Sequence, residues 1–214
     1  SVAKQLNCEP QEIIFTSGGT ESDNMILRSA VKDLKVKTII SSVLEHHAVL
    51  NVLDDLAKEG VSIRYVDLDE NGSPKLDHLE SLLEVDHTLK LVSLMHINNE
   101  IGNILDLDCV GALCKAKGAY FHTDAVQGVG HYTFDLKSQP IDFLTAAAHK
   151  FHGPKGVGFA FIRKKTALDS FIVGGPQERG LRAGTESLHN IIGLQKAIEI
   201  AYEKLDTEKS YILG

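Results

Sequence analysis

The sequence predicts an α/β fold, in which a mainly parallel (mixed) sheet is covered by helices on both faces. Short apolar runs alternate with longer segments whose apolar residues recur at helical spacing, which is the pattern of strands joined by helices. The 214 residues are enough for one large domain or two small ones, with a sizeable core. A content of 43% hydrophobic and 24% charged residues is that of an ordinary globular protein.

The first part of the chain alternates strand and helix twice. Residues 12–16 are a short apolar run typical of a strand, and Ser-Gly-Gly-Thr-Glu-Ser at 17–22 is a turn into a helix that ends near residue 32. The apolar run at 38–42 predicts a second strand, and the amphipathic segment over about 48–59 predicts a second helix.

The middle of the chain repeats this alternation. A strand is expected at 61–67, and Asp-Glu-Asn-Gly-Ser-Pro at 69–74 is a loop. The pattern then predicts a helix at 77–85, a strand at 90–95 and a helix at 107–117, which a glycine ends.

Three further strands and a long helix complete the predicted fold. The strands are expected at 119–123, 141–148 and 157–162, and a Gly/Pro-rich loop joins the last two. Residues 187–204 carry apolar side chains at helical spacing. The carboxyl ends of the strands are therefore the places to look for a ligand site.

Charge and cysteine usage narrow the class of protein. The chain has 22 basic and 29 acidic residues, a formal net charge of −7, and no basic cluster. We therefore expect neither a nucleic-acid partner nor a membrane partner, and no apolar run approaches the roughly 20 residues of a membrane span. The odd set Cys8, Cys109 and Cys114 lacks the spacing of paired bridges, so reduced thiols and a cytoplasmic location are expected.

Lys150 is the first candidate for a reactive residue. It follows the apolar run at 141–148, among small residues and before a Gly/Pro loop. Partial burial there would favour the neutral amine, which is the form that makes imines. The alternative is that Lys150 marks the point where the strand leaves the core for solvent.

Other strand ends also carry polar residues. Gly18-Gly19-Thr20 opens a helix, where free backbone N–H groups favour a phosphate, although such a turn is also a common helix cap. His46 follows the second strand and is either a cap or a ring that stacks on an aromatic ligand. The segment from His96 to Gly102 ends the fourth strand and contains two amides and a carboxylate. It is either a turn or the polar edge of a pocket.

Asp124 ends a buried strand, and Gln127 follows three residues later. A carboxylate in that position is costly unless it meets a cation, although it could also cap the next helix. Arg179 and Arg182 lie in a Gly-rich loop that suits an anion or simply faces solvent. Together, a strand-end Lys, a strand-end Asp, a ring-stacking His and an anion cradle describe a site for pyridoxal phosphate.

Six ordered segments resemble the cysteine desulfurases, which belong to the class V aminotransferase group of fold-type I pyridoxal-phosphate enzymes. The resemblance runs from about residue 12 to residue 201 and rests on SGGTES, EH, HINNEIG, HTDAVQ, AHKFHGPKG and ERGLRAGT. It implies that residues 1–214 are the large cofactor-binding domain, without the N-terminal segment and the C-terminal small domain of the family. It also implies a cysteine-like substrate, a homodimer, a sulfur-acceptor protein and a role in iron–sulfur cluster assembly.

The resemblance assigns a role to each matching residue. Lys150 would form the Schiff base and later carry a proton, His46 would stack on the ring, Asp124 would pair with the pyridinium nitrogen, and Gln127 would hydrogen-bond the ring hydroxyl oxygen. The remaining expected contacts are the phosphate ligands Gly19, Thr20 and His149, the substrate-carboxylate or ring-edge contact Asn99, and Thr185, which would reach the phosphate in the partner subunit.

The chain departs from the family pattern in two places. The family usually has a serine shortly before the lysine, but Ala146, Ala147 and Ala148 occupy this stretch, and only Thr145 offers a hydroxyl. The nucleophilic cysteine and the substrate-binding arginine of the family lie in a C-terminal part outside this chain, and the three cysteines match no catalytic position.

Other functions remain open from the sequence. His122, Asp124, His149 and His152 could supply ligands to a metal-dependent hydrolase. The chain could also be a non-catalytic scaffold, or another class V enzyme such as a selenocysteine lyase or an aminotransferase.

Overall fold

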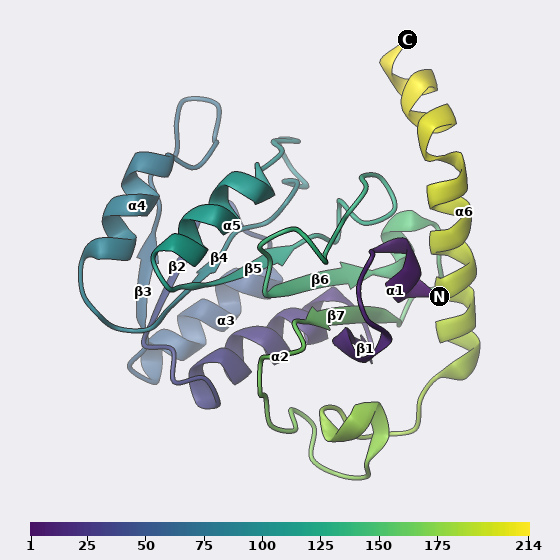
Figure 1. The fold of residues 1–214 in the computed structure, drawn as a ribbon, viewed down its shortest axis with the longest axis horizontal. Coiled ribbons are helices and arrows are strands. Elements are labelled where there is room, and N and C mark those ends of the chain that lie inside the picture. The colour runs from purple at the N-terminus through teal and green to yellow at the C-terminus, as the bar shows by residue number, and fades with distance from the viewer.

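The structure is a computed structural model, which describes residues 1–214 apart from the side chain of Leu213 (Figure 1). It contains a seven-stranded sheet in the order β1-β7-β6-β5-β4-β2-β3. The strands are β1 (Ile13–Thr16), β2 (Thr38–Ser41), β3 (Ser62–Tyr65), β4 (Lys90–Ser93), β5 (Tyr120–Asp124), β6 (Phe143–Ala147) and β7 (Gly158–Ile162).

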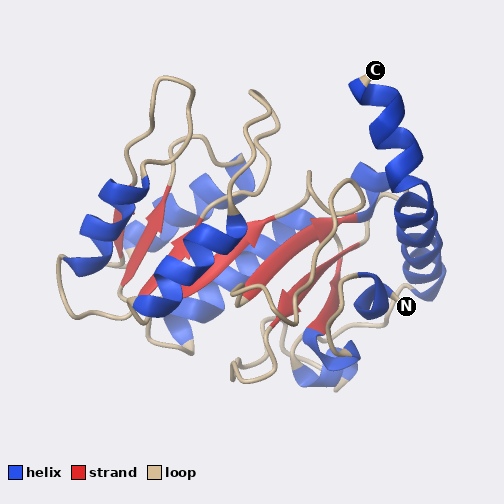
Figure 2. Ribbon diagram, turned by 45° about the horizontal axis from the view of Figure 1, so that its top comes forward, coloured by secondary structure: helices blue, strands red, loops and turns tan.

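Helices cover both faces of this sheet, as the sequence predicts (Figure 2). The α-helices are α1 (Val2–Gln5), α2 (Gly19–Lys32), α3 (His47–Lys58), α4 (Leu76–Glu84), α5 (Leu107–Ala116) and α6 (Leu188–Leu213). Three 3₁₀ turns are η1 (Pro10–Glu12), η2 (Ala148–Phe151) and η3 (Gln177–Gly180). Among the described residues, no helix is both long enough and apolar enough to cross a membrane.

The direction of the strands decides where their ends meet. β3, β2, β4, β5 and β6 pair in parallel, whereas β7 runs antiparallel to both β6 and β1. β1 therefore runs in the same direction as β6. As a result, the carboxyl ends of all strands except β7 lie along one edge of the sheet, where ligands collect in folds of this kind.

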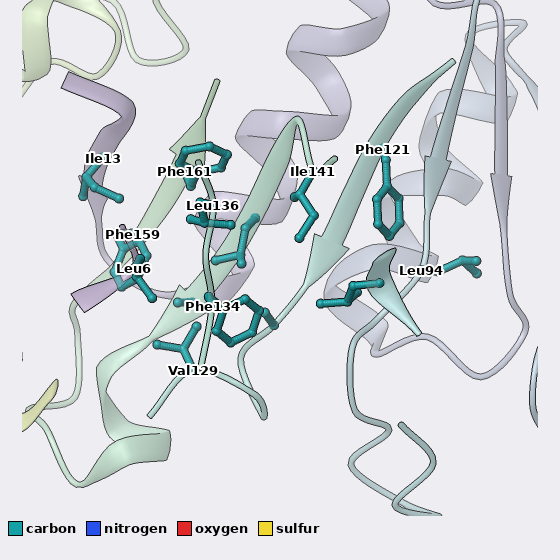
Figure 3. Packing of buried hydrophobic residues seen from close by; sticks show 14 of the residues in the cluster. Leu6, Ile13, Leu94, Phe121, Val129, Phe134, Leu136, Ile141, Phe159 and Phe161 are labelled. Carbon is teal, nitrogen blue, oxygen red and sulfur yellow. The ribbon is translucent and has the colours of Figure 1, made fainter. Parts of the chain in front are cut away.

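Neighbouring strand residues alternate between two apolar layers, because successive side chains in a strand point to opposite faces. Ile39, Leu91 and Phe143 pack with α2 and α3 on one face. Residues one position later, such as Ile40 and Val92, pack on the other face with α4, α5, α1 and α6. Figure 3 shows the second layer, in which Phe121, Phe159 and Phe161 lie among aliphatic side chains.

The sequence places the strands correctly but misjudges some ends. The strand predicted at 141–148 ends at Ala147, and Ala148 begins η2. The helix predicted at 187–204 extends to Leu213, and Figure 1 shows its last turns projecting beyond the sheet. Helix ends of this kind depend on tertiary contacts more than on the apolar pattern.

Candidate active site

A cavity of about 140 Å³ lies at the carboxyl edge of the sheet. The structure brings together eight of the nine site residues predicted from the sequence in its walls: Gly19, Thr20, His46, Asn99, Asp124, Gln127, His149 and Lys150. Each lies at the end of a strand or in the segment that follows one, so the parallel arrangement of the strands explains how residues far apart in the chain meet.

The start of α2 forms one end of the cavity. Gly19 is the first helical residue, and its backbone N–H belongs to the group at a helix start that has no partner within the helix. A Cβ atom at Gly19 would lie 2.9 Å from Cγ2 of Val126, so only glycine lets the backbone approach this closely. The free N–H groups and the Thr20 hydroxyl make this end suited to a phosphate.

Lys150 lies in η2, directly after β6, and its side chain is exposed at the cavity. The expectation that Lys150 is partly buried is therefore wrong, because the strand ends one residue earlier than predicted and the chain turns out of the sheet in η2. Nε2 of His131 lies 3.0 Å from the Lys150 carbonyl oxygen, a hydrogen-bond distance that anchors the backbone of this turn. The amine is thus held at the mouth of the cavity by a fixed main chain.

Asp124 lies deeper, with only 5% of its surface exposed. Its Oδ1 accepts a hydrogen bond from the Val126 backbone N–H at 2.9 Å, so it also caps the following turn. Burial raises the pKa of Asp124, while the hydrogen bond from Val126 and the nearby His46 and Lys150 lower it. A cation placed in the cavity would stabilise the ionised carboxylate further.

The remaining cavity residues divide between structural and ligand-facing roles. His46 is the N-cap of α3, and its Nδ1 accepts from the Ala48 N–H at 3.0 Å, so the capping interpretation holds while the exposed ring still faces the cavity. Asn98 is buried and donates to the Leu44 carbonyl oxygen at 2.7 Å. Asn99 is exposed and lines the cavity. Of the two adjacent amides, only Asn99 is therefore placed to meet a ligand.

His149 lines the cavity beside Lys150. Burial, followed by the charge of Lys150, lowers the pKa of His149, so its ring stays neutral near pH 7. A neutral imidazole still offers one N–H to a phosphate. Thr145, the only hydroxyl in the stretch before Lys150, is fully buried, and its Oγ1 lies 3.2 Å from Nε2 of His122.

Thr185 does not line this cavity. It borders a separate cavity of about 100 Å³ beside Ser17 and Arg182. The suggestion that the two arginines of this loop bind an anion is also not supported. Arg182 forms a bidentate pair with Glu21, at 2.7 and 3.2 Å, and Nη2 of Arg179 donates to the Ile13 carbonyl oxygen at 2.6 Å.

The sequence did not single out the Glu21–Arg182 pair or Asp23, which also lines the cavity. Both acids lie on α2 after Thr20. Asp23 lies four residues after Gly19 on α2, and residues at this spacing share one face of a helix. This spacing was the signal that Asp23 lies on the same side of α2 as the proposed phosphate site. Glu21 also accepts from the Ser17 N–H at 2.9 Å, so it holds the turn before α2 and, through Arg182, links this turn to the loop that carries Thr185.

Glu45 links the loop that carries His46 to the end of β4. It is buried, and its Oε1 accepts from Ser42 Oγ at 2.9 Å and from the Met95 N–H at 3.2 Å. Burial raises the pKa of Glu45 to about 8, from 4.5 in an exposed chain. The folded state thus holds this proton more tightly than the unfolded state.

We expect Glu45→Gln to change how stability depends on pH. Between about pH 5 and pH 8 the parent should lose stability as pH rises, by up to about 1.4 kcal/mol per pH unit, because the unfolded chain releases the Glu45 proton in this range while the folded chain keeps it. The glutamine keeps the accepting oxygen and has no proton to lose. Urea unfolding at several pH values checks this, and parallel stability curves for parent and variant would contradict it.

The donor set of the cavity fits pyridoxal phosphate: a helix start with Gly19 and Thr20 for the phosphate, a buried carboxyl group for the ring nitrogen, and an exposed amine for the aldehyde carbon. Within the described residues, no group of three or more His, Cys, Asp or Glu side chains could hold a metal ion. This gives no support to the metal-dependent hydrolase.

Comparison with known proteins agrees with this geometry. The family model described as aminotransferase class-V matches residues 1–211. The chain belongs to the class-V aminotransferase family. Members of this family depend on pyridoxal phosphate.

The similar proteins carry related names. The chain is 46% identical over 209 residues to cysteine desulfurase IscS of Clostridium botulinum (strain Kyoto / Type A2), a match that covers 97% of this chain and 52% of that protein. A solved structure titled NifS-like protein has a TM-score of 0.92 at 43% identity, covering 96% of this chain and 57% of that one. Another, titled SspA in complex with cysteine, has a TM-score of 0.87 at 33% identity, with 92% and 58% covered. The chain spans about half the length of the curated relatives it matches.

Proposed function

We propose that residues 1–214 are the large, cofactor-binding domain of a pyridoxal-phosphate-dependent cysteine desulfurase. The observation that carries this proposal is the single cavity in which Lys150, Asp124, His46 and the start of α2 meet. The similarity to proteins named cysteine desulfurase, and to a structure titled as a complex with cysteine, supports L-cysteine as the substrate. The products would be L-alanine and sulfur held as a persulfide on an enzyme cysteine.

Each cavity residue has a role in this reaction. Pyridoxal phosphate, when bound, supplies an electron sink for negative charge on the substrate. Gly19, Thr20 and His149 would hold its phosphate, and His46 and Gln127 its ring. Asp124 would keep a proton on the ring nitrogen, and Asn99 would orient the substrate carboxylate. The Lys150 amine, exposed at the mouth, would take a proton from the substrate and return one to the product.

The cysteines of this chain are poorly suited to accept the sulfur. Burial raises the pKa of Cys8 and of Cys114 to about 12, which leaves almost no thiolate at neutral pH. Cys109 is exposed on α5 but does not line the cavity. We therefore propose that the accepting cysteine belongs to a part of the protein beyond this chain.

The wider setting is also part of the proposal. We propose a homodimer, in which Thr185 reaches the phosphate in the partner subunit, because Thr185 lies outside the cavity of its own subunit. Transfer of the sulfur to an acceptor protein for iron–sulfur cluster assembly, in the cytoplasm, would follow. The reduced state of the three thiols is consistent with that compartment.

The test is to give the full-length protein pyridoxal phosphate, L-cysteine and a thiol reductant, and to measure alanine and sulfide. We expect the two products in equal amounts, and Lys150→Ala to lower the rate of both by about 10³-fold. Release of selenide from selenocysteine with no sulfide from cysteine would show a selenocysteine lyase instead. Amino transfer that needs a 2-oxo acid would show an aminotransferase.

A further inference from the structure

Asp23 is a second carboxyl group in the wall of the cavity that contains Asp124. It lies on α2, three residues after Thr20, and is fully buried. Within the described residues, neither of its carboxyl oxygens meets a hydrogen-bond partner. Because a buried charge without a partner is costly, the protonation state of Asp23 must follow from its neighbours.

Besides the hydroxyl of Thr145, His122 on β5 can accept a hydrogen bond from Asp23. Its Nε2 lies 3.5 Å from Oδ1 of Asp23 and 3.2 Å from the hydroxyl oxygen of Thr145. Its Nδ1 lies 2.9 Å from Oγ of Ser93. Burial lowers the pKa of His122 to about 3, so the ring is neutral and only one of its nitrogens carries a hydrogen.

The two acids have different electrostatic surroundings. Asp124 accepts a hydrogen bond from Val126 and lies near His46 and Lys150, and these groups lower its pKa against the effect of burial. Asp23 faces the acids Asp124 and Glu45 instead, so burial and then the charge of Asp124 raise its pKa well above the usual value. Two carboxyl groups in one buried site do not readily ionise together.

We propose that Asp23 is a positioning residue that keeps its proton, so that the negative charge of the cavity lies on Asp124. The neutral Asp23 donates its hydrogen to Nε2 of His122, which then carries its own hydrogen on Nδ1 and donates to Ser93. This inference rests on the proposed function, since Asp124 needs the charge to hold a protonated ring nitrogen. Asp23 itself forms no bond to the cofactor in this arrangement.

The test compares Asp23→Asn, Asp23→Ala and Asp124→Asn in the full-length protein. The amide of Asn is neutral and can still donate to His122, so it mimics the protonated acid. We expect cofactor affinity within about 3-fold of the parent for Asp23→Asn, and about 10-fold weaker for Asp23→Ala, which lacks the donor. Asp124→Asn should weaken binding more than either, because it removes the charge.

Nitrogen-15 NMR of His122 gives a readout that needs neither cofactor nor activity. The parent and Asp23→Asn should show Nδ1–H and an unprotonated Nε2 between about pH 6 and pH 9, and Asp23→Ala should show a mixture of tautomers. A protonated Nε2 in the parent, or a loss of affinity in Asp23→Asn as large as in Asp124→Asn, would overturn the proposal. If Asp23→Ala does not fold, the asparagine variant decides alone.

A failure of the proposed function would look different. The tautomer of His122 is measured without cofactor. Expected His122 signals in a protein that does not bind pyridoxal phosphate would support the proton arrangement in the cavity and contradict the proposed function. Cofactor binding together with a protonated Nε2 of His122 would contradict only the inference about Asp23.

Discussion

Lys150→Ala should abolish covalent attachment of pyridoxal phosphate and lower turnover of cysteine by about 10³-fold, since it removes both the cofactor anchor and the proton carrier. Lys150 is the lysine that lines the cavity, held in η2 by a main chain that His131 anchors. The visible absorbance of the parent with pyridoxal phosphate, before and after borohydride reduction, measures the attachment. Mass analysis of peptides from the reduced protein should find the cofactor on Lys150.

Lys155 provides the matched control. It is an exposed lysine five residues later, in the Gly/Pro loop, and does not line the cavity. Lys155→Ala should therefore keep the absorbance band and the attachment at Lys150. Reduction that fixes the cofactor at Lys155 or elsewhere, with Lys150 unmodified, would contradict the assignment.

The fold and most of the cavity could be predicted because both depend on local patterns. The alternation of apolar runs and amphipathic helices gives a mainly parallel sheet, and a parallel sheet brings the ends of its strands to one edge. Asp124 is the last residue of β5, and Lys150 and His46 lie within a few residues of the ends of β6 and β2, so placing the strands placed these residues. An error of one residue at the end of β6 did not move Lys150 out of the cavity.

The features that were missed depend on contacts between distant segments. Arg182 seemed free to bind an anion, because nothing local shows that Glu21, 161 positions away, pairs with it. Asp23 reads as an ordinary helix acid until α2 is packed against β5, which places it beside His122. The solvent exposure of Lys150 has a local cause instead, because a 3₁₀ turn follows the strand at once and carries the side chain out of the sheet.

Asp124→Asn should have opposite effects on function and on stability. The exchange removes a carboxylate that would hold the ring-nitrogen proton, so turnover should fall by about 10²-fold to 10³-fold. Without cofactor, the same exchange should stabilise the protein near neutral pH. Burial raises the pKa of Asp124 in the folded state, so folding must keep an ionised carboxylate away from water above that pKa.

We expect Asp124→Asn to keep the local structure around the end of β5. Asn keeps an oxygen that can accept from the Val126 N–H, as Asp124 Oδ1 does at 2.9 Å, so the turn after β5 should persist. Thermal unfolding with and without pyridoxal phosphate measures the two effects. The variant without cofactor should unfold at a higher temperature than the parent, and the gain on adding cofactor should be smaller.

Asp142→Asn is the control that separates the loss of cofactor binding in Asp124→Asn from the change in stability that follows from removing any buried acid. Asp142 directly precedes β6, at the opposite edge of the sheet, and burial raises its pKa too. Its Oδ2 accepts from the Phe121 N–H at 2.9 Å, so its exchange perturbs the fold in a comparable way. We expect Asp142→Asn to leave cofactor affinity within about 2-fold of the parent. Equal losses of affinity in the two variants would mean that Asp124 acts through the fold alone and does not hold the ring nitrogen.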